Sequence, residues 1–316
     1  MRAFLKQLLL FFTPIFVLGA ALEWAVRSYP TIMHQKAEGV AQHADSIEVL
    51  VLGTSHAARG VDPGEFSLWT FNSAMGSQSL YFDIALTRKH LDRLSSLKYV
   101  LISVDYHSLQ FLNEDEIDFM YDAHYDLQFE GNVDFKWRLS QLIWGYGVKE
   151  GVTLLFSPQN TCERGFSPRY DVMRNGLIDD AGKKRVVFFD RCMEGDAAYR
   201  DTILTLLTDF VVELKERDIT PVFVTLPCHE VFNRHLDSRM EQKNRDDIAL
   251  LCSRFDLEHL DWQRMPLPDS MFADQDHLRA SGAAEVSRRL NAYLESRDHT
   301  RLTFAAQASE GTATPE

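Results

Sequence analysis

The chain has 316 residues, of which 45% are hydrophobic and 25% are charged, with 33 basic and 46 acidic side chains. This composition excludes wholesale disorder, collagen-like repeats and a polytopic membrane protein. A net charge of −13 repels phosphate backbones, so no nucleic-acid partner is expected. The four cysteines, Cys162, Cys192, Cys228 and Cys252, have neither CxxC nor CxxxC spacing, which argues against zinc-ribbon and thioredoxin-like proteins and leaves their pairing open.

The N-terminal segment, residues 1–27, is apolar. Arg2 and Lys6 precede an uncharged run at 7–22, and a helix of about 20 such residues spans a bilayer with its basic end inside. A cleaved signal peptide is the alternative, because small residues occur at 19–21. A buried amphipathic helix in a cytosolic protein is the third interpretation. The first two place the rest of the chain outside the cytoplasm, as a single-pass inner-membrane protein with a periplasmic domain or as an exported one.

The remaining chain is predicted to be an α/β domain over 47–298. It follows a polar, irregular stalk at 28–46 and precedes a disordered tail at 299–316. Buried strands are expected at 47–52, 69–72, 99–104 and 221–226, and helices at 80–97, 198–217, 239–254 and 280–296. This alternation predicts a parallel sheet with helices on both faces. Residues 113–195, with one expected helix at 135–145, break the alternation and are predicted to form an insertion over one end of the sheet.

Ser55 carries the strongest local signal for chemistry. The first strand runs into Gly53, and the serine follows two residues later, at the sheet edge where ligands bind in such folds. A helix start at this point would offer backbone N–H groups to a developing oxyanion. The alternative is that Ser55 only caps the next helix. Neither a GxGxxG nor a GxxxxGK[ST] phosphate loop fits the glycines here.

Two further segments end at the same predicted edge. Asp274 and His277, three residues apart before the last helix, supply the anion and the base that a serine nucleophile requires. Asn72 and the Gly76 amide, at and beyond the end of the second strand, are candidate oxyanion donors. Each segment alone also fits an ordinary turn or cap. Together they predict a Ser-His-Asp triad.

The pattern resembles the SGNH (GDSL-like) hydrolase superfamily over about 46–296. Gly53-Thr54-Ser55 matches the first block with Thr in place of Asp, Gly76 matches the second-block glycine, and Asp274 with His277 matches the last block. The resemblance implies a three-layer, flavodoxin-like α/β/α fold. More narrowly, the chain is similar to membrane-anchored exported members that modify surface polymers, such as the D-alanine transfer protein of teichoic-acid synthesis and polysaccharide O-acetyltransferase accessory proteins.

One position departs from the family pattern. Where the third block normally has an oxyanion asparagine, this chain has Asp105, whose carboxylate would oppose an oxyanion if it pointed there. The resemblance implies an esterase or O-acyltransferase acting on acyl groups, acetyl above all, of a cell-surface polysaccharide, without a cofactor. A transferase would need a membrane-bound acyl-donor protein as partner. The alternative is a non-catalytic binding or assembly component of a cell-envelope polymer system.

Other polar and aromatic residues carry weaker signals. His56 and Asp105 are candidate substrate-binding residues. No metal site is predicted, because the remaining His and Asp spacings match no strong ligand motif. Aromatic residues in the insertion either stack on sugar rings or form a small satellite core; they are Trp137, Trp144, Tyr146, Phe166 and Tyr170.

Overall fold

The computed structural model describes residues 1–111, 161–168, 177–193 and 197–310, together with Tyr121, Tyr125, Leu127, Thr153, Leu155 and Phe156; for 299–310 it describes the backbone only. The chain divides into two compact units, residues 1–37 with 114–161 and residues 38–113 with 162–316. The second unit contains the sheet and every residue of the candidate site.

A five-stranded parallel sheet forms the centre of the second unit. Its strands are β1 (Val49–Leu52), β2 (Thr70–Asn72), β3 (Tyr99–Ser103), β4 (Thr220–Thr225) and β5 (His259–Asp261), in the order β2-β1-β3-β4-β5. The predicted α/β fold with a parallel sheet is therefore confirmed. The strand order reverses between β1 and β3, and this switch point is where open α/β sheets bind ligands. The edge strand β5 was not predicted, because it has three residues and no apolar run.

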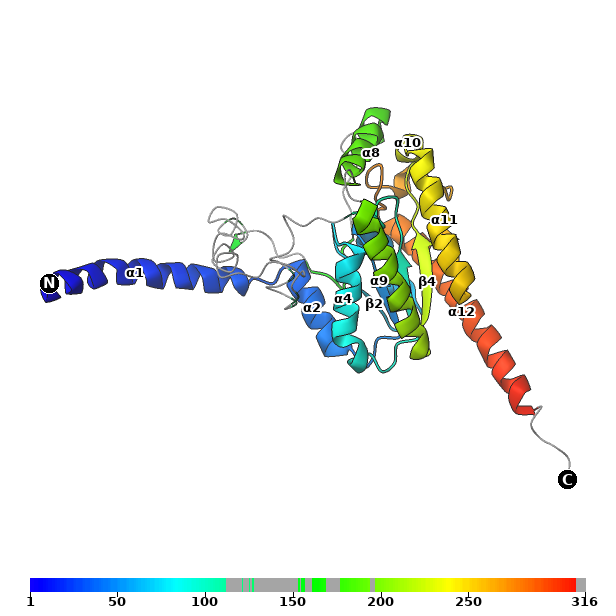
Figure 1. Cartoon of the computed structure of the whole chain (residues 1–316), viewed down its shortest axis with the longest axis horizontal. Helices are drawn as coiled ribbons and strands as arrows, with labels where there is room; N and C mark the ends of the chain where they lie inside the picture. Colours follow the sequence, from blue (N-terminus) through cyan, green and yellow to red (C-terminus); the bar gives the residue numbers. More distant parts are fainter. Residues whose placement is uncertain are drawn as a thin grey trace, which may run out of the picture. The chain divides into compact units, whose positions relative to one another are not determined.

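Helices cover both faces of the sheet (Figure 1). One face packs against α4 (Leu80–His90), α9 (Ala197–Glu216) and α11 (Ser238–Phe255). The other face packs against α3 (Ser55–Gly60) and α12 (Ala280–Glu310). Alternate strand residues supply the two cores: Leu50 and Leu52 face the first, and Val49 and Val51 the second. Because both faces are buried, the central strands β1 and β3 are nearly continuous apolar runs, as their sequences predicted.

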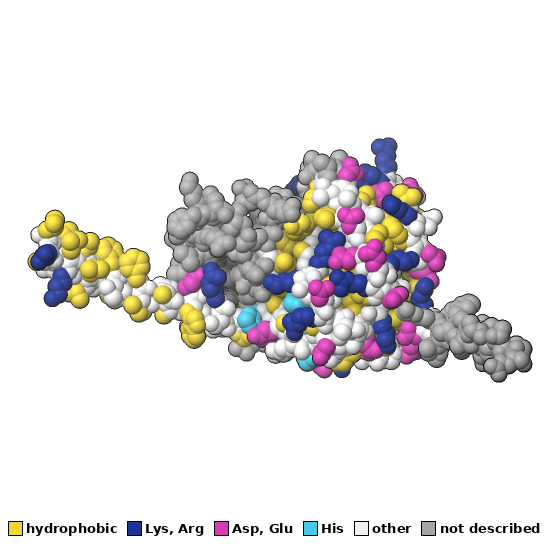
Figure 2. Space-filling model, turned by 60° about the horizontal axis from the view of Figure 1, so that its bottom comes forward, with side chains coloured by type: hydrophobic (Ala, Val, Ile, Leu, Met, Phe, Trp, Pro, Cys, Tyr) yellow, Lys and Arg dark blue, Asp and Glu magenta, His cyan; other side chains and the backbone are white. Residues whose placement is uncertain are grey.

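The N-terminal helix α1 (Arg2–Arg27) has 26 residues and contains Pro14. Its length and composition allow it to cross a membrane, and a signal sequence would pass the same test. Figure 2 shows hydrophobic side chains along this helix and basic ones at its first turns. In the structure its large apolar side chains are exposed, with Phe4, Leu9 and Phe16 between 65% and 73% accessible.

Three segments differ from the sequence-based expectations. The stalk contains α2 (Ile32–His43), because Val40 packs into the core and gives the segment an apolar face. Helix α12 continues to Glu310, past the predicted end of order, through a stretch rich in the strong helix formers Ala, Leu, Gln and Glu. Within the predicted insertion, α8 (Asp179–Met193) is an additional helix that packs against α10 (Glu230–Asn233). The helix expected at 135–145 lies outside the described residues.

Candidate active site

The turn after β1 is formed by Gly53. Its φ of +138° lies in a region that favours glycine, and a Cβ there would lie 2.5 Å from the Cβ of Ser103 on β3. The Gly53 N–H donates to Asp83 Oδ1 at 3.0 Å, which ties the turn to α4. A side chain at position 53 would therefore push β1 away from β3, and the glycine allows the chain to turn directly into α3.

Thr54, and not Ser55, caps α3. The Thr54 Oγ1 accepts a hydrogen bond from the His56 N–H at 3.3 Å, and Ser55 is the first helical residue. The capping alternative for Ser55 is therefore wrong. Its hydroxyl instead lies 2.8 Å from Nε2 of His277.

The loop before α12 presents His277 to this serine. His277 Nδ1 lies 2.8 Å from Asp274 Oδ1, and the same oxygen accepts from the backbone N–H groups of His277 at 2.9 Å and Asp276 at 3.2 Å. The Asp274 carboxylate is thus fixed by its own loop before it orients the imidazole. Ser55, His277 and Asp274 are brought together with the contacts that a serine nucleophile, its base and the orienting acid require.

The two candidate oxyanion donors differ in position. A Cβ built on Gly76 would lie 4.0 Å from Ser55 Cβ, so this backbone runs beside the serine. Asn72 is fully buried, and its Nδ2 donates to the carbonyl oxygens of Ala57 at 2.9 Å and Val61 at 2.8 Å. Both hydrogens of that amide are used in holding α3, so Asn72 has none left for an oxyanion. The donors that remain are the amides of Gly76 and of Ser55 at the helix start, where N–H groups lack helical partners.

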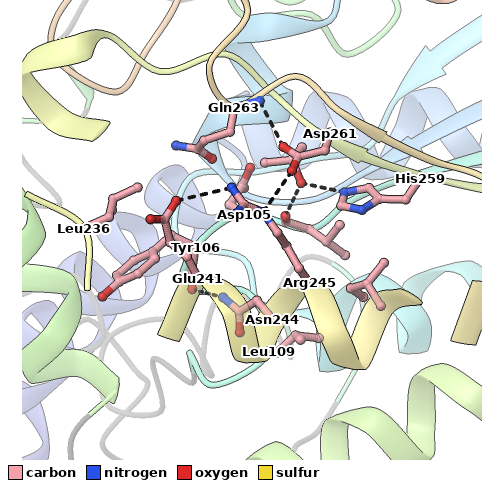
Figure 3. A pocket seen from close by; sticks show the side chains of 13 residues that line it. Asp105, Tyr106, Leu109, Leu236, Glu241, Asn244, Arg245, His259, Asp261 and Gln263 are labelled. Atoms are coloured by element: carbon pink, nitrogen blue, oxygen red, sulfur yellow. Dashed lines mark hydrogen bonds and ion pairs between the residues drawn. The ribbon is translucent and has the colours of Figure 1, made fainter. Parts of the chain in front are cut away.

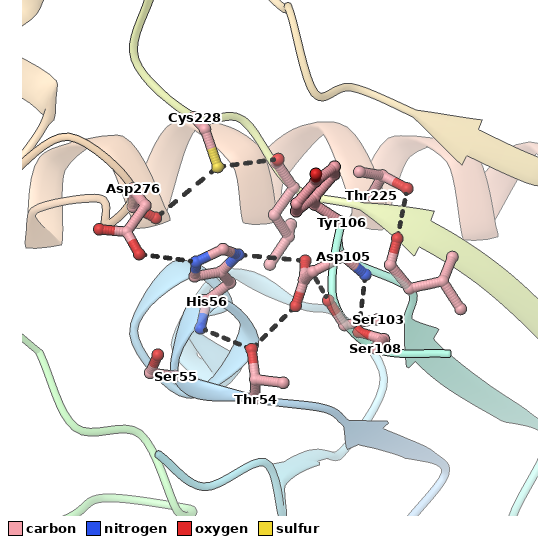
Figure 4. Close-up of polar contacts among 12 residues, drawn as sticks. Thr54, Ser55, His56, Ser103, Asp105, Tyr106, Ser108, Thr225, Cys228 and Asp276 are labelled. Atoms are coloured by element: carbon pink, nitrogen blue, oxygen red, sulfur yellow. Dashed lines mark hydrogen bonds and ion pairs between the residues drawn. The ribbon is translucent and has the colours of Figure 1, made fainter. Parts of the chain in front are cut away.

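A buried charge cluster lies next to the triad, and Figure 4 shows all of its members except Arg185. We use "charge cluster" for His56, Asp105, Asp276 and Arg185. The His56 ring lies between two carboxylates: Nε2 is 3.2 Å from Asp276 Oδ2, and Nδ1 is 3.2 Å from Asp105 Oδ1. His56 and Asp105 are 4% and 3% exposed, so they face each other and not solvent. Their expected role in direct substrate binding does not fit this position.

The Asp105 carboxylate is held by side chains of β3 and of the turn after β1. It accepts hydrogen bonds from Thr54 Oγ1 at 2.8 Å and Ser103 Oγ at 3.1 Å. Thr54 and Asp105, the two positions at which the sequence departs from the pattern that it resembles, are therefore bonded to each other. All these contacts lie on the His56 side of α3.

The carboxylates keep His56 charged. Burial alone would lower the pKa of His56, but Asp105 and Asp276 outweigh it and raise the pKa to about 10. Burial would likewise raise the pKa of Asp105, but His56 lowers it to about 2. The pKa of Asp276 is held well below its usual range by His277 and His56, although burial opposes the shift. The cluster therefore contains a buried imidazolium between two carboxylates.

Arg185 completes the charge cluster from α8. Its Nε donates to Asp276 Oδ2 at 2.6 Å, and its guanidinium lies 4.5 Å from the centre of the Phe189 ring. His107 stacks on the same aromatic ring, with its centroid 4.0 Å from that of Phe189, and burial lowers its pKa to about 3. Sequence reasoning missed both Arg185 and Asp276; no local motif marks Arg185, whereas Asp276 lies inside the predicted Asp-His segment.

The ligand atoms of His56, Asp276 and His277 lie within 4.8 Å of one another, close enough to hold a metal ion. Each of these side chains already has protein partners. Asp276 Oδ2 is bound by Arg185, His277 Nε2 by Ser55, and the two ring nitrogens of His56 face carboxylates. A metal ligand must offer a free lone pair, which a protonated His56 lacks. The residues present therefore fit a hydrogen-bonded network better than a metal centre.

A separate small pocket opens at the carboxyl ends of β4 and β5 (Figure 3). Asn244 and Arg245 of α11 line it from one side and His259 and Asp261 of β5 from another. Asp105 is the one residue that it shares with the charge cluster, and no member of the triad lines it. The pocket thus adjoins the site without containing the reactive serine.

Two further sets of residues from the sequence analysis are the aromatic residues of the predicted insertion and the four cysteines. Phe166 is buried, whereas Trp137, Trp144, Tyr146 and Tyr170 lie outside the described residues. All four cysteines lie in the described part of the chain, and none of them forms a disulfide.

Comparison with families of known proteins and with curated sequences finds no match. Solved structures do match. They include a GDSL-like lipase from Bacteroides thetaiotaomicron, with 9% identity over 84% of this chain and 99% of that one and a TM-score of 0.41. A lipase/acylhydrolase from Enterococcus faecalis has 10% identity over 79% and 97%, with a TM-score of 0.39. A catalytic mutant of an acetylxylan esterase from Geobacillus stearothermophilus has 10% identity over 77% and 92%, with a TM-score of 0.35.

Proposed function

We propose that the protein is a serine acyl-esterase or O-acyltransferase that works through an acyl-enzyme on Ser55. One observation carries the proposal: Ser55 Oγ, the two nitrogens of His277 and Asp274 Oδ1 form an unbroken chain with two 2.8 Å contacts. The serine also lies at a helix start beside Gly76, where backbone N–H groups gather.

The reaction follows from these contacts. Ser55 Oγ attacks the acyl carbonyl carbon while His277 Nε2 takes the hydroxyl proton, and Asp274 holds the ring and stabilises its charged form. The amides of Ser55 and Gly76 receive the oxyanion. When the tetrahedral intermediate collapses, the C–O bond to the alcohol breaks, and His277 returns the proton to the departing oxygen. Water or a sugar hydroxyl then gives a proton to His277 and attacks the acyl carbon. The bond from that carbon to Ser55 Oγ breaks, and His277 returns the proton to the serine oxygen.

We extend the proposal to the substrate and the location. The acyl group, acetyl in the simplest case, would be carried by a cell-surface polysaccharide, with α1 holding the enzyme on the outer side of the cytoplasmic membrane. The apolar length of α1 and the basic residues Arg2 and Lys6 ahead of it support this location. As a transferase, the enzyme would receive its acyl group from a membrane-bound donor protein, since acyl-CoA is a cytoplasmic metabolite.

The decisive experiment treats the full-length, detergent-solubilised protein with a fluorophosphonate probe and locates the label by peptide mass spectrometry. Labelling at Ser55 is expected in the wild type, and both Ser55→Ala and His277→Ala should lose it. Ser67→Ala, which changes an exposed serine bonded to Asn291, is the matched control and should label normally. Aryl acetate hydrolysis, with and without a chelator, gives the second readout.

A folded wild type that the probe does not label would contradict the role of Ser55 as nucleophile and would favour a non-catalytic binding role on the same fold. Activity that a chelator abolishes and zinc restores would assign the chemistry to the metal-sized cluster at His56, Asp276 and His277 instead. In cells, Ser55→Ala alone should change the acyl content of the envelope polymer; unchanged content would refute the cellular role.

A further inference from the structure

We propose that Arg185 and His56 are positioning residues that neutralise Asp276, so that the carboxylate beside the catalytic base does not hold His277 in its protonated form. The inference rests on the proposed function, because it concerns the base of that reaction. In this interpretation the charge cluster keeps a second aspartate next to the triad without disabling the base.

The starting point is that two carboxylates face one nitrogen of His277. Asp274 Oδ1 lies 2.8 Å from His277 Nδ1, and Asp276 Oδ1 lies 3.4 Å from the same atom. Asp276 is 1% exposed, and its Oδ1 accepts no hydrogen bond from any described residue. A buried carboxylate so close to an imidazole favours the imidazolium. A general base must be neutral when it takes the serine proton, so this carboxylate opposes catalysis unless its charge is balanced.

The balance comes from the other oxygen of Asp276. Its Oδ2 lies 2.6 Å from Arg185 Nε and 3.2 Å from His56 Nε2. The charge cluster thus holds two cations, Arg185 and His56, and two anions, Asp276 and Asp105. Among the residues that the structure describes, the other titratable groups that face it are the His107 ring at 5.6 Å from His56 and the Cys228 thiol at 3.8 Å from the Asp276 carbonyl. Neither adds a charge, because burial lowers the pKa of His107 and raises that of Cys228.

Arg185 is held in place for this contact. Helix α8 packs so closely on α10 that a Cβ on Gly182, one turn before Arg185, would lie 1.7 Å from the carbonyl oxygen of Val231. The guanidinium also lies over Phe188 and Phe189 of its own helix. A side chain that is 27% exposed is therefore fixed at one end of a fully buried carboxylate. The helix that interrupts the regular α/β alternation thus delivers one charge to the catalytic centre.

The test measures the rate of Ser55 labelling against pH in single and double variants of the full-length protein, which differ in the net charge of the cluster. Arg185→Gln leaves the charge cluster with one excess negative charge, and Asp276→Asn leaves it with one excess positive charge. We call the range in which the labelling rate falls on acidification the acid limb of the pH profile. This limb should move to higher pH by about one unit in Arg185→Gln and to lower pH by about one unit in Asp276→Asn. The double variant is neutral again, and its limb should return close to that of the wild type.

Arg191→Gln is the matched control, since it removes an exposed arginine from the same helix and should leave the limb in place. The opposite signs distinguish neutralisation from damage to the fold, which would reduce labelling in each variant without moving the limb in two directions. Shifts of the same sign, or a double variant worse than both single ones, would overturn the inference. NMR titration of the His277 ring, identified by its loss in His277→Gln, should show the same order without turnover. If the wild type does not label but the His277 titrations of the variants still differ in this order, the proposed function is wrong and the inference about charge neutralisation is supported.

Discussion

His277 and His56 have ring centroids 5.3 Å apart and share a carboxylate neighbour, yet their surroundings suit different roles. Both nitrogens of His56 face carboxylates, which favours a ring that carries two protons at once. His277 faces carboxylates through Nδ1 only, and its Nε2 faces the hydroxyl of Ser55. His56 is therefore placed as a fixed charge, whereas the proposed function assigns the proton exchange with Ser55 to His277. The two rings thus differ in one neighbour: a second carboxylate faces His56, whereas the Ser55 hydroxyl faces Nε2 of His277.

The largest expected effect concerns the acid that orients His277. Asp274→Asn should lower kcat about 10⁴-fold, because the amide cannot hold the tautomer that accepts the serine proton. Steady-state hydrolysis of an aryl acetate measures it, with circular dichroism to check folding. Asp276→Asn is the paired variant and should lose far less. An equal or larger loss of kcat in Asp276→Asn would contradict the role of Asp274 and would indicate that Asp276 orients His277.

The next effect concerns the fixed charge. His56→Gln leaves Asp105 and part of Asp276 without their cation, and we expect the free energy of unfolding to fall by about 3–5 kcal/mol. Urea titration measures this fall. Asp269→Asn is the control: this carboxylate is 81% exposed and pairs with His229, so about 1 kcal/mol or less is expected. Equal losses in the two variants would mean that the buried pair contributes no more than a surface pair.

The same substitution predicts a pH dependence of stability. The pKa of His56 rises from 6.5 to about 10 on folding, so its contribution is complete below pH 6.5 and is lost as pH rises toward about 10. That of Asp105 falls from 3.8 to about 2, so its contribution is present above 3.8 and is lost as pH falls toward about 2. The wild type should therefore lose its stability advantage over His56→Gln between pH 6.5 and about 10. A constant advantage across that window would contradict the charged state of His56.

The smallest effect separates packing from catalysis at Asn72. Asn72→Ala removes three buried hydrogen bonds, two to the carbonyl oxygens of Ala57 and Val61 and one from the Ala74 N–H, and should cost about 1–3 kcal/mol of unfolding free energy. Its kcat should change by much less than the ~10²-fold expected for an oxyanion donor. Asn291→Ala, which removes an exposed contact to Ser67, is the matched control for stability. A large fall in kcat with unchanged stability would restore Asn72 to the oxyanion hole.

Much of the fold could be predicted from local patterns. Strand β1 is an uninterrupted apolar run before Gly53, β3 is an apolar run that ends at Ser103, and the parallel sheet brings the ends of its strands to one edge. Helix α8 was missed, although Gly182, Val186, Phe189 and Met193 recur on one buried face. They lie in a segment rich in Asp and aromatic residues, where the regular alternation had already failed.

The triad could be proposed because its residue types and their order along the chain carry the information. The charge cluster could not, because it depends on contacts between distant segments. His56 and Asp276 are 220 positions apart, and Arg185 and Asp276 are 91 apart. Whether His56 meets a substrate or a carboxylate is decided by tertiary packing, which no motif around it reports. The capping alternative was likewise considered one residue late, at Ser55, because serine and threonine are both good caps and the N-cap is Thr54.

The paired charges of Arg185 and Asp276 limit the substitutions that the protein can accept during evolution. A single substitution at Arg185 or Asp276 leaves an unbalanced charge in the interior, whereas replacing both together by neutral residues restores the balance. We therefore expect relatives to keep both residues or to lose both, although one lies on α8 and the other in the loop before α12. An alignment of such relatives should show these two positions changing in the same lineages, while the exposed Arg191 on the same helix changes independently.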